Sequence, residues 1–326
     1  MTSTLAGIDI RRYRDDDELA VRDLLRASLG AGPAGERPPE FFRWKHLRNP
    51  FGRSYMLVAE EDGRVVGFRS FLRWRFSAGD TTVTAVRAVD TATHPDFQGR
   101  GIFRTLTLAA LDDLRSETDL VFNTPNAKSG PGYLKMGWRS VGRVPIGIRV
   151  RRPIRFLRNV RHLGADEPRR TPPRVEAETA SGATLAGRAS VGTDERLSTL
   201  RPPDYLTWRY LDAPLLDYRI VSDGDGAAIF RVRPRGRLWE ATVVELFASD
   251  PAVGARLLRR VARSADVDHV SCSFPSGTIA ASAARRCGFV PSPQGPTLMT
   301  NPLRDLPLDP GSLRSWALTL GDVEVF

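Results

Sequence analysis

The stretch with the clearest chemical potential is HPDFQGRGIFRTL, residues 94–106. Pro95 cannot donate a backbone hydrogen bond, so a preceding strand is expected to end there. Gly99 and Gly101 carry no Cβ atom, and the backbone can therefore turn tightly and approach a ligand closely. From Ile102 onward the apolar residues recur at helical spacing. Because the first turn of a helix has unsatisfied N–H groups and a favourable dipole, this stretch predicts a site for a phosphate ester or a pyrophosphate.

Two common phosphate motifs are excluded at this stretch. No Gly-Lys-Ser or Gly-Lys-Thr follows the glycines, as a Walker loop requires. The third glycine of the dinucleotide fingerprint is also missing. A glycine-rich turn without a ligand remains an alternative when the stretch is considered alone.

The elements around this stretch alternate between strands and helices. Their order favours an α/β (α+β) domain with a mixed sheet flanked by helices. Helices are expected after Asp17, from Pro39, from Ile102 to about Ser116 and over Pro131–Met136. The expected strands are Ile8–Tyr13, Ser54–Glu60, Arg64–Phe71, Arg73–Ser77, Thr82–Thr91, Leu120–Asn123 and Arg143–Val150.

The chain is basic, with a formal net charge of +10 over 326 residues, a length that suits two domains. Arginine carries almost all of the positive charge, since the only lysines are Lys45, Lys128 and Lys135. A solvated basic surface explains this balance, and attraction of a polyanionic cofactor is the sharper alternative. Nucleic acid is not expected as a partner, because no helix-turn-helix, zinc-finger or RNA-binding motif accompanies the charge.

Cysteines and histidines bear on the compartment and on metals. Cys272 and Cys287 are the only cysteines, which favours a reducing, cytoplasmic location without a disulfide framework. No Cys-x-x-Cys pair is present and the histidines are scattered, so no metal site is expected. The first residues lack the apolar core of a secretory signal. No run approaches about 18 apolar residues, so no membrane span is expected.

The second half of the chain repeats the first. The motif PEFFRWKHLRNP at residues 39–50 is matched by PDYLTWRYLDAP at residues 203–214, and the hairpins that follow the two motifs match as well. We therefore expect two copies of one domain. The expected division is a catalytic domain at residues 1–150, a basic proline-rich linker at 151–180, and a degenerate copy with a C-terminal tail at 181–326.

The second copy has lost the glycines of the first. Opposite HPDFQGRGIFRTL it reads SDPAVGARLLRRV, which retains only Gly254. A helix is still expected there, because Asp250 can cap it and Pro251 suits its first position. The second copy is therefore expected to be a scaffold or a wall of the substrate cleft.

The first half resembles the GNAT superfamily of acyl-CoA-dependent N-acyltransferases, and the whole chain resembles a tandem GNAT protein. The family signature Gln/Arg-x-x-Gly-x-Gly/Ala is matched by QGRGIF, residues 98–103, in which Phe103 replaces the final small residue. A second signature is matched by Asn126, Tyr133 and the pair Gly137-Trp138. The degenerate copy has Gly277 and Ala284 opposite Asn126 and Tyr133, which implies a single active site in the first half.

The resemblance implies direct transfer of an acetyl group from acetyl-CoA to a primary amine in a ternary complex. Backbone N–H groups of the glycine turn would hold the pyrophosphate, and the strand ending at Thr93 would pair with the pantetheine arm. An N–H group near Ala92 would donate to the oxyanion. The cofactor-binding residues implied in this way are Ala92, Thr93, Gln98, Gly99, Arg100, Gly101, Ile102, Phe103, Arg104 and Asn126.

Two residues are the catalytic candidates. Tyr133 is implied as the general acid, because its phenol can protonate a departing thiolate. A packed tyrosine with a purely structural role is the alternative. Asp90 is the candidate base for the acceptor ammonium, and a hydrogen-bonded carboxylate at a strand end is its alternative.

The C-terminal stretch SWALTLGDVEVF is a second candidate for the acceptor side. Residues 316–320 alternate as a strand, and Asp322, Glu324 and the carboxylate of Phe326 follow. Some members of the family place a C-terminal carboxylate in the acceptor site, whereas a docked edge strand is the simpler interpretation.

The sequence therefore favours an N-acetyltransferase acting on a small cationic primary amine, such as an amino sugar. A non-catalytic acyl-CoA-binding or scaffold protein and a protein N-acetyltransferase are the alternatives. The acceptor, the acyl-chain length and the oligomeric state are not indicated by the sequence.

Overall fold

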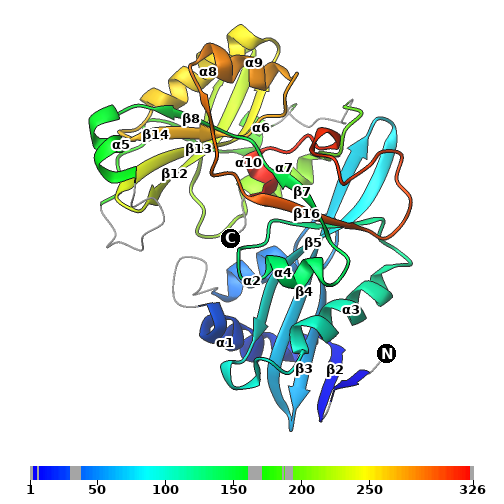
Figure 1. Ribbon diagram of the computed structural model, residues 1–326. Coiled ribbons are helices and arrows are strands. Elements are labelled where there is room, and N and C mark those ends of the chain that lie inside the picture. Colours follow the sequence, from blue (N-terminus) through cyan, green and yellow to red (C-terminus); the bar gives the residue numbers. More distant parts are fainter. Residues whose placement is uncertain are drawn as a thin grey trace.

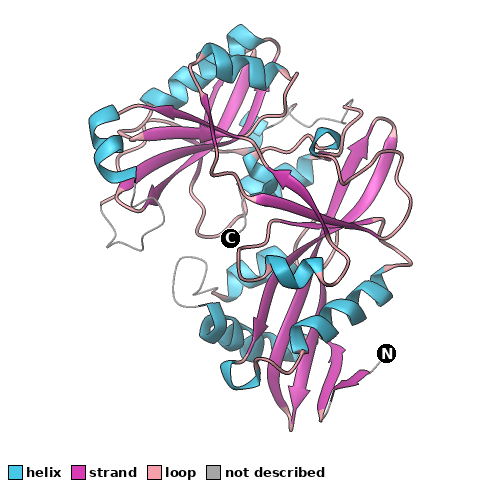
Figure 2. Ribbon diagram, viewed as in Figure 1, coloured by secondary structure: helices cyan, strands magenta, loops and turns pink. Residues whose placement is uncertain are grey.

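Two mixed sheets, each flanked by helices, form two domains that lie against each other (Figures 1 and 2). The computed structural model describes residues 3–5, 7–29, 38–160, 171–185, 187 and 194–323. Among the described strands, one neighbouring pair in each sheet is parallel and the others are antiparallel. The predicted fold class, two tandem α/β domains with mostly antiparallel mixed sheets, is confirmed.

The first sheet has the strand order β1-β2-β3-β4-β5-β6-β16-β7, and β10 pairs with β4. Its helices α1 (Glu18–Leu29) and α2 (Pro39–His46) pack on one face, while α3 (Ile102–Leu114) and α4 (Gly130–Leu134) pack on the other. The strands are β1 (Ser3–Leu5), β2 (Ile8–Arg12), β3 (Tyr55–Glu61), β4 (Arg64–Ala78), β5 (Thr81–Thr93), β6 (Leu120–Asn123), β7 (Arg139–Arg143), β10 (Ser198–Thr199) and β16 (Thr297–Pro302).

The second sheet has the order β15-β8-β14-β13-β12-β11-β9. Its strands are β8 (Ile146–Val150), β9 (Glu178–Thr179), β11 (Tyr218–Asp223), β12 (Gly226–Arg235), β13 (Leu238–Ala248), β14 (His269–Cys272) and β15 (Val290–Ser292). The remaining helices are α5 (Pro153–Asn159), α6 (Gly182–Leu185), α7 (Pro203–Tyr210), α8 (Pro251–Arg263), α9 (Ile279–Arg286) and α10 (Leu320–Val323), and the short 3₁₀ turns are Asp15–Asp17, Pro95–Phe97 and Leu313–Ser315.

The two domains exchange a strand. In the first half β7 is followed by β8, but β8 pairs with β14 of the second sheet. In the second half β15 is followed by β16, but β16 lies between β6 and β7 of the first sheet. The exchange is reciprocal, so both sheets are completed by the other copy. The domain boundary predicted at residue 150 remains a proposal. Strand pairing crosses it in both directions, because β8 lies before it but joins the second sheet, and β16 lies after it but joins the first.

Two sequence expectations about strands are wrong. The strand expected over Arg143–Val150 is interrupted at Val144 and Pro145, because β7 and β8 enter different sheets there. The strand expected over residues 316–320 is absent from this described segment. Trp316 forms an isolated bridge with Leu197, and the chain then turns into α10. Residues 316–318 are all buried, which is incompatible with an edge strand that exposes alternate side chains.

Candidate active site

The candidate site lies where β5 and β6 part. Their parallel pairing joins Ala85 to Leu120 and ends at Arg87 and Phe122. β5 continues to Thr93, whereas β6 ends at Asn123. Beyond the last pair, the described residues enclose a cavity of about 820 Å³ between these strand ends and the N-termini of α3 and α4.

The glycine turn enters α3 at one end of this cavity. Gly99 and Gly101 have φ angles of +79° and +83°, in the left-handed region that favours glycine. A Cβ at either position would meet no heavy atom within 4 Å, so backbone conformation, rather than crowding by the protein, requires glycine here. Gly101 is the N-cap of α3 and no side chain caps the helix. The first-turn N–H groups therefore stay available to an external anion.

Most of the cofactor-binding residues implied by the resemblance line this one cavity. Arg100 is the exception, because its guanidinium pairs with Glu61 at 3.2 Å and lies 4.6 Å from the centre of the Phe97 ring. Arg104 is exposed at the cavity rim. The residues that line the cavity are Ala92, Thr93, Gln98, Gly99, Gly101, Ile102, Phe103, Arg104 and Asn126.

Tyr133 lies on α4 and lines the same cavity as the glycine turn. Its side chain is 4% exposed, and its hydroxyl makes no hydrogen bond to the described residues. The ring meets Phe103 edge-on at 5.5 Å and Trp138 at 5.0 Å between centroids. Asn126 builds the turn that leads into α4, since its Oδ1 accepts from the backbone N–H groups of Lys128 and Ser129. The tyrosine is thus held by its ring while its hydroxyl is left for another partner.

Asp90 is the extra residue of a β-bulge in β5. Arg69 pairs with Thr91 and Ser70 with Val89, so Asp90 has no opposite residue, and its φ is +38°. Asp90 lines the cavity from this position, and its side chain is 3% exposed. A bulge re-aims a side chain and interrupts the hydrogen-bond ladder, which is what a ligand-facing strand needs.

Two buried partners of Asp90 were not identified from the sequence. Lys45 Nζ lies 2.7 Å and His46 Nε2 2.9 Å from the same oxygen of Asp90. His46 Nδ1 in turn lies 3.0 Å from Ser54 Oγ and 3.1 Å from Ser70 Oγ. Both partners lie at the C-terminal end of α2, directly after the apolar residue Trp44, and no sequence pattern marked them as partners of Asp90. The Asp90 side chain is therefore fixed by a buried polar network.

Asn123 is a further cavity residue that the sequence did not single out. It is buried at the end of β6 and lines the cavity, and its Oδ1 has no hydrogen-bond partner among the described residues. Buried polar atoms are almost always satisfied, so an unpartnered acceptor beside a cavity indicates a ligand that donates a hydrogen bond.

In the second domain, residues of the domain itself occupy the position that corresponds to this site. At the N-terminus of α8, Asp250 Oδ1 accepts from the N–H groups of Ala252 at 2.6 Å and Val253 at 3.0 Å. An anion therefore finds these amides already occupied. β13 and β14 part after Val243 and Cys272, as β5 and β6 do after Arg87 and Phe122.

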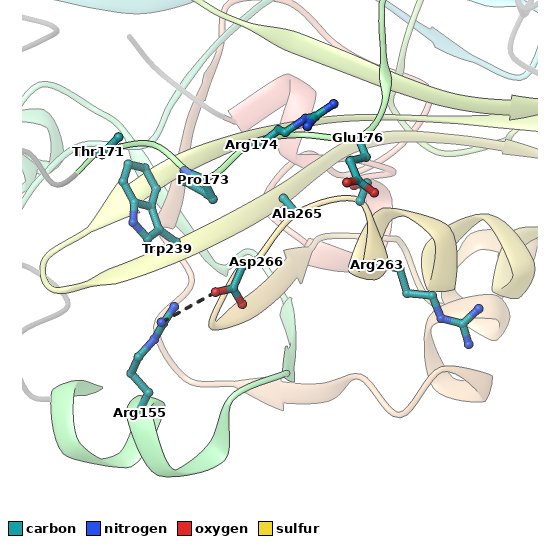
Figure 3. Close-up of a pocket in the computed structure, with 10 residues that line it drawn as sticks. Arg155, Thr171, Pro173, Arg174, Glu176, Trp239, Arg263, Ala265 and Asp266 are labelled. Atoms are coloured by element: carbon teal, nitrogen blue, oxygen red, sulfur yellow. Dashed lines mark ion pairs between the residues drawn. The ribbon is translucent and has the colours of Figure 1, made fainter.

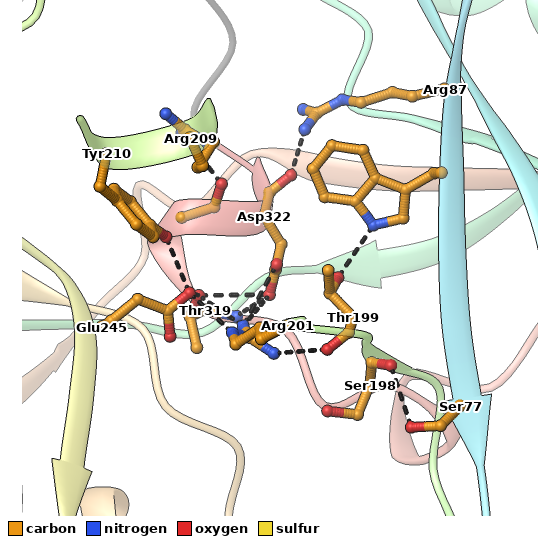
Figure 4. Close-up of polar contacts among 12 residues, drawn as sticks. Ser77, Arg87, Ser198, Thr199, Arg201, Arg209, Tyr210, Glu245, Thr319 and Asp322 are labelled. Atoms are coloured by element: carbon orange, nitrogen blue, oxygen red, sulfur yellow. Dashed lines mark hydrogen bonds and ion pairs between the residues drawn. The ribbon is translucent and has the colours of Figure 1, made fainter. Parts of the chain in front are cut away.

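The C-terminal helix α10 packs at that second opening. A Cβ on Gly321 would lie 2.3 Å from the Tyr210 hydroxyl and 3.0 Å from a carboxylate oxygen of Glu245, so only glycine fits there. Arg201 binds Glu245 at 2.8 Å and Asp322 at 3.1 Å (Figure 4). The expectation that Asp322 faces a cationic acceptor is wrong, because its carboxylate is fully buried in this ion-pair cluster. Glu324 and Phe326 lie outside the described residues.

Arg87 connects this cluster to the first domain. Its guanidinium donates to the backbone carbonyl of Asp322 (Figure 4). It also donates to the carbonyl of Val323 at 2.9 Å and to Thr124 Oγ1 at 3.2 Å. Thr124 lines the first-domain cavity. Complete burial, together with Arg209, lowers the pKa of Arg87 to about 10. The C-terminal helix is therefore bonded to a strand that leads directly into the candidate site.

The basic segment after residue 150 is used inside the second domain. Arg152 and Arg155 pair with Asp266, at 2.8 Å and 4.0 Å, and Arg155 also binds Asp268. A cavity of about 510 Å³ lies beside them and is bordered by Trp239 and Arg263 (Figure 3). These ion pairs account for two of the arginines without a nucleic acid.

Metal binding and membrane crossing find no support in the described part of the chain. Its histidine, cysteine and acidic side chains form no group of three or more that could hold a metal ion. None of its helices combines the length and the apolar character needed to cross a bilayer.

Comparison with known proteins identifies the family. Residues 9–141 match the sequence model of the acetyltransferase (GNAT) domain. No curated protein matches the chain significantly. Among solved structures, a GCN5-related N-acetyltransferase from Kribbella flavida is 17% identical, with a TM-score of 0.59 over 92% of this chain and 72% of that one. Eis1 from Mycobacterium abscessus is 16% identical, with a TM-score of 0.57 over 91% and 73%. A GCN5-related N-acetyltransferase from Anabaena variabilis is 12% identical, with a TM-score of 0.61 over 91% and 73%.

The sequence match places a GNAT-type domain in the first half of the chain, and the solved structures share the fold. Residues 9–141 are an acetyltransferase (GNAT) domain by this match. The structural likeness covers both domains, so the tandem arrangement is part of the shared fold.

Proposed function

We propose that this chain is an N-acetyltransferase that moves the acetyl group of acetyl-CoA to a small primary amine. The observation that carries the proposal is the cavity shared by the uncapped N-terminus of α3 and the ring-held Tyr133. An anion-binding helix end and a phenol donor that line one cavity suit a phosphate-bearing thioester.

The residues present fit coenzyme A. The left-handed glycines leave the first-turn amides of α3 open for a pyrophosphate, and Arg104 adds a positive charge at the rim. Asn123 offers an acceptor for an amide N–H of the pantetheine arm, and Ala92 and Thr93 offer backbone groups from β5. Bound acetyl-CoA supplies the acetyl thioester.

The chain supplies positioning and proton transfer for this reaction. Holding amine and thioester in one cavity removes about 7–11 kcal/mol of the barrier in well-oriented systems. Asp90 accepts the proton of the acceptor ammonium, directly or through water. Tyr133 gives its phenol proton to the departing sulfur. Asp90 and Tyr133 both line this cavity, so both protons are handled without movement of the domains.

A small cationic amine is the proposed acceptor. Asp90 is the only acidic side chain among the described residues that line the cavity, and it attracts an ammonium group. Because the carboxylate already binds Lys45 and His46, its attraction for an ammonium group acts only at short range.

Two measurements test the proposal. Calorimetry should detect binding of acetyl-CoA, and thiol release should follow when a panel of amino sugars and other primary amines is added. Tyr133→Phe should keep acetyl-CoA binding and lose about 10²–10⁴-fold in kcat, which is the usual contribution of a positioned general acid. Full activity of this variant would reject Tyr133 as the acid.

The alternatives give different results in the same experiments. Binding of acetyl-CoA without thiol release from any amine would favour an acyl-CoA-binding or scaffold protein. Thiol release with peptides but not with small amines would favour a protein N-acetyltransferase. Absence of acetyl-CoA binding would reject the proposed function.

A further inference from the structure

Arg69 is a buried cation without an anionic partner. It lies in β4 at 0% exposure and is among the largest fully buried side chains of the described residues. Nη1 donates to Thr91 Oγ1, whereas Nε and Nη2 have no hydrogen-bond partner and no described acidic side chain pairs with the guanidinium. Burying an unpaired charge is costly, so the retention of one requires an explanation.

Three aromatic rings surround this guanidinium. Its central carbon lies 4.4 Å from the centre of Phe71, 5.4 Å from that of Tyr133 and 5.7 Å from that of Phe103. A cation near aromatic faces is attracted by the ring electrons, and this attraction is stronger away from water. Phe103 and Tyr133 line the candidate active site, so the charge lies directly behind the cavity wall.

The degenerate copy loses this cation where it also loses the tyrosine. The bulge in β13 falls between Ile229 and Phe230 of the partner strand, as the bulge in β5 falls between Arg69 and Ser70. Ile229 therefore occupies the position of Arg69, and Ala284 stands opposite Tyr133 in the aligned sequences. The arginine and the phenol are present together in one copy and absent together from the other.

We propose that Arg69 is a positioning residue for proton transfer by Tyr133, an inference that rests on the proposed acetyl transfer. In that step the amine nitrogen forms a bond to the acetyl carbon and the carbon–sulfur bond breaks. The phenol proton moves to sulfur, and the tyrosine oxygen becomes negative. Arg69 holds the ring that carries this oxygen and places a fixed positive charge behind it. Nitrogen loses two protons between the ammonium and the amide: one leaves through Asp90 to solvent and the other restores the phenol through solvent, so the atoms and charges balance.

A double-mutant cycle tests the coupling of the two residues. Arg69→Met removes the charge at similar length, and Arg69→Lys retains a charge. We expect Arg69→Met to lower kcat by at least about 10-fold while the KM for acetyl-CoA changes less than about 3-fold, as expected for an interaction made in the transition state. Arg69→Lys should recover part of the loss. In a Tyr133→Phe background, Arg69→Met should change the residual kcat by less than about 3-fold.

Several results would overturn the inference. One is an equal loss of kcat in the presence and absence of the Tyr133 hydroxyl, and another is an unchanged kcat in a folded Arg69→Met protein. A lysine variant no better than the methionine variant would show that packing, not charge, matters. Arg149→Met is the matched control, because Arg149 Nη1 is also buried without a partner but lies on β8 of the second domain. Should Arg69→Met not fold, Arg69→Gln takes its place in the same cycle.

A second readout separates this inference from the proposed function. Fluorine NMR of protein labelled with 3-fluorotyrosine gives a Tyr133 resonance, assigned by its loss in Tyr133→Phe. Arg69→Met should shift that resonance and Arg69→Lys should shift it less, whereas Arg149→Met should leave it in place. An unshifted resonance would overturn the inference even in an active enzyme. Shifted resonances in a protein that transfers no acetyl group would reject the proposed function and retain the contact.

Discussion

Trp44 and Trp208 occupy the same position in the two copies and bind each other across the domain interface. Their rings stack at 5.0 Å and 20°. The indole N–H of Trp44 donates to the carbonyl of Trp208 at 2.7 Å, and that of Trp208 donates to the carbonyl of Trp44 at 2.9 Å. A reciprocal contact of this kind is what a two-fold relation between the copies produces. The exchange of β8 and β16 follows the same relation.

Loss of either indole N–H should weaken the fold to a similar degree. Trp44→Phe removes the donor to the Trp208 carbonyl, and Trp208→Phe removes the reciprocal donor. We expect each to lower the free energy of unfolding by about 1–3 kcal/mol, the cost of a buried polar group without its partner. Urea denaturation measures this. Trp138→Phe is the control, since the buried Trp138 Nε1 has no partner among the described residues and its removal should cost less.

Binding of coenzyme A should require the left-handed backbone conformation at Gly101 of the glycine turn. Gly101→Ala forces a side chain into φ +83° and should cost about 1–3 kcal/mol of stability, together with at least a 10-fold loss of CoA affinity. Gly277→Ala is the matched control, because Gly277 has φ +82° and equally open surroundings but lies in the second copy. Calorimetry with CoA should show unchanged affinity for this control. Equal losses of affinity in both variants would argue against the turn as the phosphate site.

The buried ion pair of Arg201 and Asp322 should be needed for the docking of α10. Asp322→Asn leaves the buried guanidinium with Glu245 alone and should destabilise the protein by about 3–5 kcal/mol. Thermal unfolding measures the loss. Arg256→Ala breaks the exposed pairs with Asp223 and Asp225 and should leave the unfolding temperature nearly unchanged. A loss for Asp322→Asn as small as that of the exposed pair would show that α10 does not depend on this contact.

Acid should destabilise the second domain through Glu240. Burial by itself raises the pKa of this carboxyl, but Arg233, His269 and Arg235 outweigh it and bring the pKa well below the ordinary 4.5. The unfolded chain therefore binds a proton that the folded chain does not, so stability is present above pH 4.5 and falls as the pH drops below it.

Glu240→Gln isolates this effect. The variant should be less stable than the parent at pH 7 and should lose less further stability between pH 5 and pH 3, measured by urea denaturation at each pH. Glu178→Gln, at an exposed position on β9, is the control and should follow the parent curve. A parallel decline in Glu240→Gln and in the parent would place the acid sensitivity elsewhere.

The glycine turn could be predicted from the sequence because it depends on the chemistry of neighbouring residues. Proline before the turn, two glycines within it and a helical apolar pattern after it all act over neighbouring residues, and the structure has the left-handed angles that those glycines permit. The same holds for Asp250, whose capping of α8 follows from its place directly before Pro251. The repeat was visible for a similar reason, because α2 and α7 preserve a local motif.

Contacts between distant residues were not readable in this way. Asp90 was predicted as the candidate base, but its bonds to Lys45 and His46 depend on how α2 packs on β5. Arg69 showed no signal, since an arginine in a strand is ordinarily exposed on one face. The segment at 316–320 alternates like a strand, yet its burial between the two sheets led it into α10 instead.

The sequence by itself determined the fold class, the duplication, and the place of the glycine turn, because each depends on patterns a few residues long or on repetition of such patterns. Tertiary structure alone decided that the copies exchange β8 and β16, that α10 closes the second opening, and that Arg69 stands unpaired behind Tyr133. These features depend on which surfaces meet when the two domains pack. Residues far apart in the chain come into contact there, and no local sequence pattern predicts which of them will pair.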